Sequence, residues 1–175
     1  MRILQLIDSL EAGGAERMAV NYANALSKII PFSALICTRA EGSLKNELSN
    51  EVKYHFLEKR NTVDFQAIQQ LRSFCISNKI ELIHAHSTSF FLATIVKIIM
   101  PKIKIIWHNH NGMSHQLPSY KISIIRWAST YFAGTIVVNQ QLLNWSGERL
   151  KLSNLIYLEN FAVHETYLQD DLKLY

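Results

Sequence analysis

The sequence predicts an α/β protein: a doubly wound parallel sheet of about seven strands with helices on both faces. Short apolar runs alternate with segments of helical spacing along most of the 175 residues. The first unit, residues 3–26, has the pattern of a strand, a glycine turn and a helix. Neither an internal repeat nor a linker interrupts the alternation before residue 160. This regular succession of strands and helices is typical of one open parallel sheet.

Gly13 and Gly14 separate the first strand from the first helix. We expect them to adopt positive φ and to bring the backbone close to a ligand. The helix after them should place an apolar stripe on the sheet, made of Ala15, Met18, Ala19, Tyr22 and Leu26. The polar residues expected to face water are Glu16, Arg17, Asn21 and Asn24. A strand that enters a helix through glycines puts backbone N–H groups where an anion can bind. A tight turn without a ligand is the alternative, because the dinucleotide and phosphate-loop patterns are absent.

The remaining elements continue the alternation. Strands are expected over residues 32–37, 52–57, 81–85, 103–107, 135–138 and 154–158, the second of these nearer an edge. Helices are expected from Asp64, as N-cap, to residue 77; over 88–99, before Pro101; from Ser119, as cap, to residue 132; and near 142–145. Residues 38–50 should form a loop with a short helix, residues 109–118 a polar loop, and residues 162–175 show no clear strand.

Composition fits one domain in a reducing compartment. The 49% hydrophobic residues are enough for a full core. Cys37 and Cys75 lie in apolar segments, as buried thiols do, and nothing indicates a disulfide framework. The N-terminus enters a strand without a signal peptide, and lysines and a proline interrupt the most apolar stretch, residues 90–107. We therefore expect a cytoplasmic protein with no spanning helix.

The charge is unevenly distributed along the chain, whose formal net charge is +4. No acidic residue lies between Glu81 and Glu148. The basic residues of that stretch are Lys97, Lys102, Lys104, Lys121 and Arg126. One half of the molecule should therefore attract phosphates or acidic lipid headgroups. Together with Phe90, Phe91 and Trp127, these residues favour peripheral contact with the inner face of an anionic membrane; a solvated basic face is the alternative.

Polar side chains gather where the predicted strands end. Ligands of open parallel sheets bind beyond the carboxyl ends of the strands. The residues expected there are Asp8, Ser9, Gly13, Gly14, His84, His86, Ser87, His108, Asn109, His110, Asn111, Asn139, Glu159 and Asn160. Turns prefer Gly, Asn and Asp and have no special need for histidine. The histidines therefore predict a working cleft.

The paired histidines raise the question of a metal. His84 and His86, like His108 and His110, are spaced so that each pair can share one face of an extended segment. The chain has no carboxylate or cysteine partner at ligand spacing, so we expect no metal and one histidine of each pair lining the cleft. The signatures of serine hydrolases, activated cysteines, glycosidase carboxylate pairs and RNA-binding aromatics are absent, and no nucleic-acid partner is expected.

A family resemblance lies in segments that follow one another along the chain: IDSLEAGGAERMAVNYANAL, ELIHAHSTSF, IIWHNHNG, TIVVNQ and NLIYLENF. Together they are similar to the N-terminal, Rossmann-like domain of GT-B, family-4-type retaining glycosyltransferases. The resemblance implies two such domains facing across a cleft, the N-terminal one holding mainly the acceptor and the C-terminal one the nucleotide. It implies residues 1–163 as the acceptor-side domain and residues 164–175 as the start of a linker or tail.

The resemblance also implies an activity. Such enzymes transfer a hexose from a nucleotide-sugar, UDP- or GDP-linked, to a saccharide or lipid-linked acceptor in the synthesis of surface polysaccharides such as capsule or lipopolysaccharide. The donor is a substrate, and no cofactor is expected in this domain. The paired glutamates of the C-terminal domain are missing here. We therefore expect that domain on the same or a separate chain, and no turnover without it.

Site residues carry over by position. His110, before Asn111 and Gly112, matches the cleft histidine of the family and is the expected catalytic residue, with His108 as its rival. Gly13 and Gly14 match the glycine loop near the donor phosphates and the acceptor. The other residues expected in the cleft are Glu16, His86, Ser87, Asn109, Asn139 and Asn160.

Two other functions stay open at this point. The first is a non-catalytic Rossmann-like module that recruits a catalytic glycosyltransferase partner to the membrane. The second is a small protein that binds a nucleotide or a flavin tightly by itself. Donor sugar, acceptor, linkage and oligomeric state have no signature in the sequence.

Overall fold

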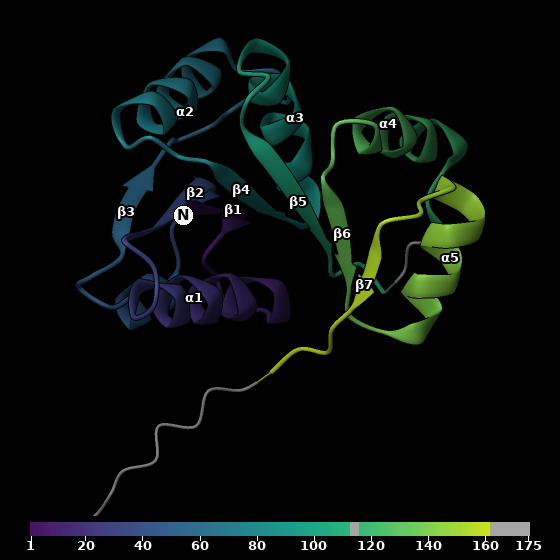
Figure 1. Ribbon diagram of the computed structural model, residues 1–175, viewed down its shortest axis with the longest axis horizontal. Coiled ribbons are helices and arrows are strands. Elements are labelled where there is room, and N and C mark those ends of the chain that lie inside the picture. The colour runs from purple at the N-terminus through teal and green to yellow at the C-terminus, as the bar shows by residue number, and fades with distance from the viewer. Residues whose placement is uncertain (113–115, 162–175) are drawn as a thin grey trace, which may run out of the picture.

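The computed structural model describes residues 1–112 and 116–161, which form one sheet in the order β3-β2-β1-β4-β5-β6-β7 (Figure 1). The strands are β1 (Arg2–Ser9), β2 (Phe32–Ala40), β3 (Lys53–Phe56), β4 (Leu82–His86), β5 (Lys104–Asn109), β6 (Gly134–Val137) and β7 (Leu155–Tyr157). Every neighbouring pair is parallel. The chain reverses its direction of travel across the sheet between β1 and β4, and this switch point is where open α/β sheets bind ligands.

Helices cover both faces of the sheet. They are α1 (Gly14–Ser27), α2 (Phe65–Ser77), α3 (Phe90–Ile99), α4 (Ser119–Ser129) and α5 (Gln140–Leu150), with short 3-10 turns η1 (Ser43–Glu47) and η2 (Ser87–Ser89). Figure 1 shows α1 on one side of the sheet and α2 and α3 on the other. The predicted doubly wound α/β architecture is confirmed, as is the edge position of the third strand.

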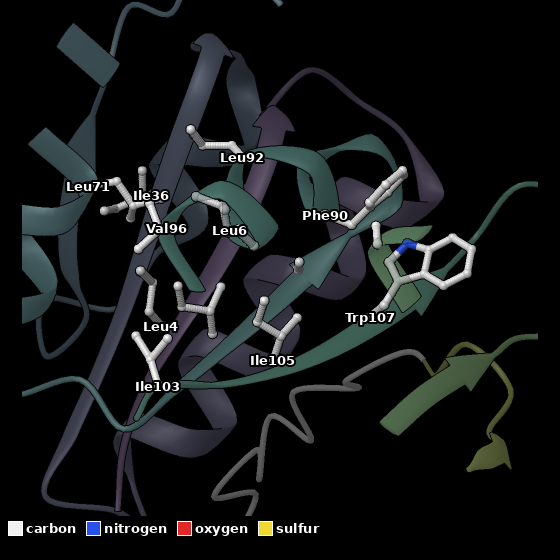
Figure 2. Close-up of a cluster of buried hydrophobic side chains, with 14 of the residues drawn as sticks. Leu4, Leu6, Ile36, Leu71, Phe90, Leu92, Val96, Ile103, Ile105 and Trp107 are labelled. Carbon is white, nitrogen blue, oxygen red and sulfur yellow. The ribbon is translucent and has the colours of Figure 1, made fainter. Parts of the chain in front are cut away.

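Side chains that alternate along the strands build two hydrophobic cores. Leu4 and Leu6 of β1 enter the larger core, which α2, α3, α4 and α5 also fill, and Figure 2 shows it around Leu71, Phe90 and Trp107. Ile7 enters the smaller core beneath α1. Burial of each large apolar side chain contributes about 2 kcal/mol. Both faces of the central strands are covered, which is why they read as nearly continuous apolar runs.

The glycine turn differs from the prediction. No glycine of residues 1–112 and 116–161 has positive φ, and Gly13, the N-cap of α1, is extended at φ −162°. A Cβ at residue 13 would meet only the end of the flexible Glu16 side chain, 2.3 Å from its Oε2, so the space at this position does not require glycine either. Asn21 was also expected to face water, yet it is buried and its amide donates to the carbonyl of Phe161. The buried face of α1 thus contains Asn21 and Val20 in addition to the predicted Met18 and Ala19.

Helix boundaries follow their caps. Asp64 is confirmed as the N-cap of α2, with Oδ1 accepting from the amide of Ala67 at 3.1 Å, a contact that contributes about 1 kcal/mol. Ser119 is not a cap: extended Pro118 precedes α4, which ends at Ser129 rather than at residue 132. The helix expected near 142–145 is longer, because Asn139 caps it by accepting from the amide of Leu142. None of the helices in the described ranges is long and apolar enough to cross a bilayer.

Candidate functional site

A cavity of about 580 Å³ opens at the switch point of the sheet. Its walls come from the segments after β1, β4 and β5, from α4 and from the chain after β7. The lining residues are Gly14, Ala15, Ser87, Thr88, Phe90, Trp107, Asn109, His110, Asn111, Leu117, Lys121, Ile124, Ile125 and Asn160. Apolar atoms make up much of the wall, and half of the lining residues have polar side chains that could orient a small molecule.

The turn after β4 is held in an uncommon conformation. Ser87 has φ 50°, in the left-handed region that non-glycine residues rarely enter and that costs about 1 kcal/mol or more. Trp107 holds it there by donating from Nε1 to the Ser87 carbonyl at 2.9 Å. The hydroxyl of Ser89 donates to the carbonyls of Leu6 and His86, both at 2.7 Å. The turn thereby fixes Ser87 in the cavity wall.

Four histidines form a stacked column across β4 and β5. His86 pairs with His108 in the register of the two strands. The ring of His108 stacks on His84 at a centroid distance of 5.2 Å and on His110 at 4.0 Å. Tyr22 of α1 packs edge-on against His84 and His108. The column therefore lies between the sheet and α1, and it reaches the cavity at His110.

Burial keeps the imidazoles of the column neutral. It lowers the pKa of His84 to about 3 and that of His110 to about 4, because desolvation penalises the charged form. The pKa of His108 is lowered to about 2 and that of His86 well below 6.5, again mainly by burial, with a contribution from neighbouring histidines. At neutral pH these rings act as hydrogen-bond donors and acceptors rather than as cations.

Hydrogen bonds connect the rings in two pairs. Nδ1 of His86 lies 3.1 Å from Nε2 of His110, and Nδ1 of His108 lies 3.2 Å from Nε2 of His84. Oε1 of Gln5, on β1, lies 2.8 Å from Nε2 of His86. Beneath the cavity there is thus a network of neutral groups from three neighbouring strands.

The same column is the strongest candidate for a metal in the described part of the chain. His84, His86 and His108 can offer nitrogen atoms within 4.8 Å of one another. The set contains no carboxylate or thiolate to offset the charge of a buried divalent ion. Its nitrogens also serve the hydrogen bonds between rings. The absence of a metal stays a prediction.

The start of α1 borders the cavity at Gly14 and Ala15. Gly13 offers no side-chain cap, so the free N–H groups of the first turn and the positive end of the helix dipole suit an anion. Lys121, on α4, supplies a cation to the same cavity. Glu16 lies in the first turn and folds over Gly13. This part of the site therefore offers backbone donors and the positive charge of Lys121, with the carboxylate of Glu16 beside them.

The sequence matches Glycosyltransferase Family 4 over residues 12–157, most of the chain. The chain belongs to glycosyltransferase family 4. No curated protein matches the sequence. The switch-point cavity is thus the candidate site of a glycosyltransferase family 4 domain.

Solved structures agree on the fold of this family 4 domain. The structure of Anabaena Alr3699/HepE in complex with UDP matches with a TM-score of 0.71 and 15% identity, over 91% of this chain and 44% of that one. The structure of the same protein with UDP and glucose matches equally. A glycosyltransferase from Rickettsia africae ESF-5 matches with a TM-score of 0.71 and 12% identity, over 90% of this chain and 42% of that one. The chain thus has the fold of one half of a GT-B glycosyltransferase and spans less than half the length of these relatives.

The structure brings part of the predicted cleft together. The predicted residues on the cavity wall are Gly14, Ser87, Asn109, His110, Asn111 and Asn160. Between the rival histidines, His110 reaches the cavity, whereas His108 is fully buried. His86 lies behind His110, and Gly13 and Glu16 lie beside Gly14. Asn139 is outside the lining, because its side chain caps α5.

The basic residues do not form one patch. Lys121 lines the cavity, but Lys104 begins β5 at the opposite end of the sheet. Lys97 donates to the carbonyls of Pro101 and Ile103, both at 2.6 Å, and so closes the end of α3. Phe90, expected at a membrane, is buried in the core. Of the aromatic residues expected there, Trp127 is the exposed one.

Other residues of the site were not expected in the cleft, and Lys121 was expected only as part of the basic stretch that attracts phosphates or acidic lipid headgroups. Lys121 and Ile124 reach the cavity only because α4 packs against its rim. Thr88 was not singled out, although its hydroxyl donates to Asp8 at the end of β1. Gln5 could have been singled out from the sequence, because it is the one polar side chain inside the apolar run ILQLI of a predicted buried strand. Its partner His86 could not be identified without the sheet order.

Proposed function

We propose that this chain is the acceptor-side half of an enzyme that transfers a sugar from a nucleotide-sugar to a saccharide or lipid-linked acceptor in surface polysaccharide synthesis. The carrying observation is the switch-point cavity of a family 4 chain, bordered by the start of α1 and by His110. The Anabaena relative, whose structure contains UDP and glucose, supports a UDP-linked donor, with GDP as the alternative nucleotide.

The chemistry follows from where charge develops. When the sugar leaves the nucleotide, negative charge grows on the diphosphate. Backbone N–H groups of the first turn of α1 and the ammonium of Lys121 are suited to stabilise that charge. His110, neutral at the cavity wall, is suited to assist near the reacting sugar or the phosphate through hydrogen bonds. It is not assigned as a nucleophile.

The proposal requires a second Rossmann-like domain. The described cavity lies at the carboxyl ends of the central strands of one sheet. The relatives with this fold are more than twice as long as the matched region. The second domain, on the same or a separate polypeptide, supplies the paired glutamates and most contacts to the nucleotide. This chain supplies the acceptor side and the groups near the diphosphate.

A donor-and-acceptor screen tests this function. The complete enzyme, with both domains, is incubated with UDP- and GDP-sugars and saccharide or lipid-linked acceptors, and products are identified by mass spectrometry. We expect one donor to give an acceptor heavier by one sugar. If no pair of donor and acceptor gives a product, and this chain instead stimulates a separate glycosyltransferase, the proposed function is wrong. The chain would then be the non-catalytic module that recruits a catalytic partner.

The acceptor side of the proposal includes a membrane contact through α4. Tyr120, Ile124 and Trp127 are 63%, 40% and 45% exposed, and their spacing puts them on one stripe of the helix. Ile124 and Lys121 also line the cavity. An aromatic stripe next to a lysine suits the interface of an anionic bilayer. An acceptor anchored in lipid would reach the cavity from this side.

A further inference from the structure

Gln5 is a buried polar residue in the middle of the central strand β1, and its exposure is 0%. Strands covered on both faces normally carry aliphatic side chains there, and a buried amide is costly unless it is hydrogen-bonded. Its Oε1 lies 2.8 Å from Nε2 of His86. Its Nε2 has no partner among residues 1–112 and 116–161. The hydrogen bond to His86 is therefore what the amide contributes.

This contact determines which nitrogen of His86 carries the proton. A carboxamide oxygen only accepts hydrogen bonds, so Nε2 of His86 must be the donor. The ring is fully buried and neutral, and a neutral imidazole carries one proton. Nδ1 of His86 is therefore a bare acceptor.

The tautomer of His86 in turn determines the tautomer of His110. Nε2 of His110 lies 3.1 Å from that acceptor and must supply the hydrogen. Because His110 is also neutral, its Nδ1 keeps a lone pair. This nitrogen is buried, and no side chain or backbone group of the described residues contacts it by a hydrogen bond. A buried acceptor without a partner is costly, so a donor brought by a ligand gains a full hydrogen bond.

We propose that Gln5 is a positioning residue that, through His86, holds His110 in the tautomer whose Nδ1 accepts a hydrogen bond from a hydroxyl group of the sugar substrate. The identity of that hydroxyl donor as a sugar rests on the proposed function; the tautomer chain does not. The opposite tautomer would present an N–H group and favour a phosphate oxygen. Gln5 therefore decides which substrate group His110 can bind.

Nuclear magnetic resonance tests the tautomers without any substrate. The chain is labelled with ¹⁵N-histidine, and two-bond ¹H–¹⁵N correlations report the protonated nitrogen of each of the seven histidines. His86→Asn and His110→Asn identify their signals by loss. We expect both rings to carry the proton on Nε2. A proton on Nδ1 of His110 in the wild-type chain overturns the proposal, whatever the variants do.

The variant Gln5→Met tests whether the hydrogen bond from His86 to Gln5 is what determines the tautomer of His110. Methionine keeps the length of the side chain but accepts hydrogen bonds only weakly, so the bias on His86 is lost. We expect the tautomer ratio of His110 to change by about fivefold or more. Gln69→Met, on the exposed side of α2, is the matched control and leaves both signals unchanged. Unchanged His86 and His110 signals in a folded Gln5→Met chain would overturn the proposal.

Kinetics of the complete enzyme separate this inference from the proposed function. Gln5→Met should lower kcat about tenfold, through loss of one oriented hydrogen bond, and leave the KM of the donor within about twofold. A merely structural role would lower the melting temperature without changing the tautomers. If no sugar transfer is found at all, the proposed function fails, while the spectra still decide the tautomer chain.

Discussion

At the residue scale, His110 is the side chain that joins the buried histidine column to the cavity. Its ring stacks on His108, bonds to His86 and lines the cavity wall. In the complete enzyme, His110→Ala should lower kcat about 10²-fold, because a group that acts on the transition state contributes that much. Steady-state kinetics measure the change. His55→Ala, on β3, is the control. An unchanged kcat would remove His110 from the mechanism.

Protonation of the column should destabilise the fold in acid. The pKa values of His84, His86, His108 and His110 are all lowered from 6.5, mainly by burial. The unfolded chain therefore binds more protons than the folded one as the pH falls below 6.5, and stability is lost in that window. At about pH 5 each histidine costs about 2 kcal/mol.

Urea unfolding at about pH 7.5 and about pH 5 measures this loss. We expect the free energy of unfolding to fall by several kcal/mol. His84→Phe removes one titrating ring while keeping an aromatic side chain, and should reduce the loss by about 2 kcal/mol. Equal stability at both pH values would mean that the rings are solvated rather than buried.

The column should hold no metal, although three of its nitrogen atoms lie close together. A divalent ion there would have no anionic ligand and would break the hydrogen bonds between the rings. Elemental analysis of the purified chain should find less than about 0.1 zinc per chain, and a chelator should leave the melting temperature unchanged. A stoichiometric metal whose removal lowers that temperature would contradict this expectation.

At the element scale, α4 is the helix expected to contact a membrane. Trp127→Gln removes the largest exposed ring of its apolar stripe. We expect partitioning of the chain onto anionic phospholipid vesicles to fall about fivefold or more, since burial of such a ring contributes at least 1 kcal/mol. Co-sedimentation measures it. Phe65→Gln, at a ring on α2 that is 82% exposed against 45% for Trp127, is the control and should change nothing. Equal loss in both variants would point to non-specific adsorption.

The elements that were predicted well are those with local signals. Leu4, Leu6 and Ile7 lie in an apolar run because both faces of β1 are covered, and Asp64 caps the helix that starts next to it. The start of α5 also has a local signal, the cap at Asn139, which was interpreted as a site residue instead; the rest of α5 is held in the larger core by Trp145 and Leu150. Positive φ at Gly13 was predicted from the residue type alone, whereas its extended N-cap conformation, at φ −162°, does not require glycine.

At the scale of the whole molecule, the sheet order decides which predicted residues meet. Strand ends could be read from the sequence, but not that β4 lies between β1 and β5. That order brings Gly14, Ser87 and His110 to one cavity. Asn139 follows β6, one strand further out, where its amide serves α5. Gln5 and Lys121 required knowledge of neighbours far away in the sequence.

The division of the site between two domains gives the last prediction. In the proposed enzyme, the cavity of residues 1–161 supplies the groups near the diphosphate, and a second domain binds the base and ribose. UDP at about 1 mM should therefore raise its melting temperature by less than about 1 °C, whereas the complete enzyme should gain several degrees, because stabilisation grows with ligand concentration over Kd. Differential scanning fluorimetry compares the two, with uridine as the control without phosphates. A large shift in this chain alone would contradict the division of labour and favour a small nucleotide-binding protein.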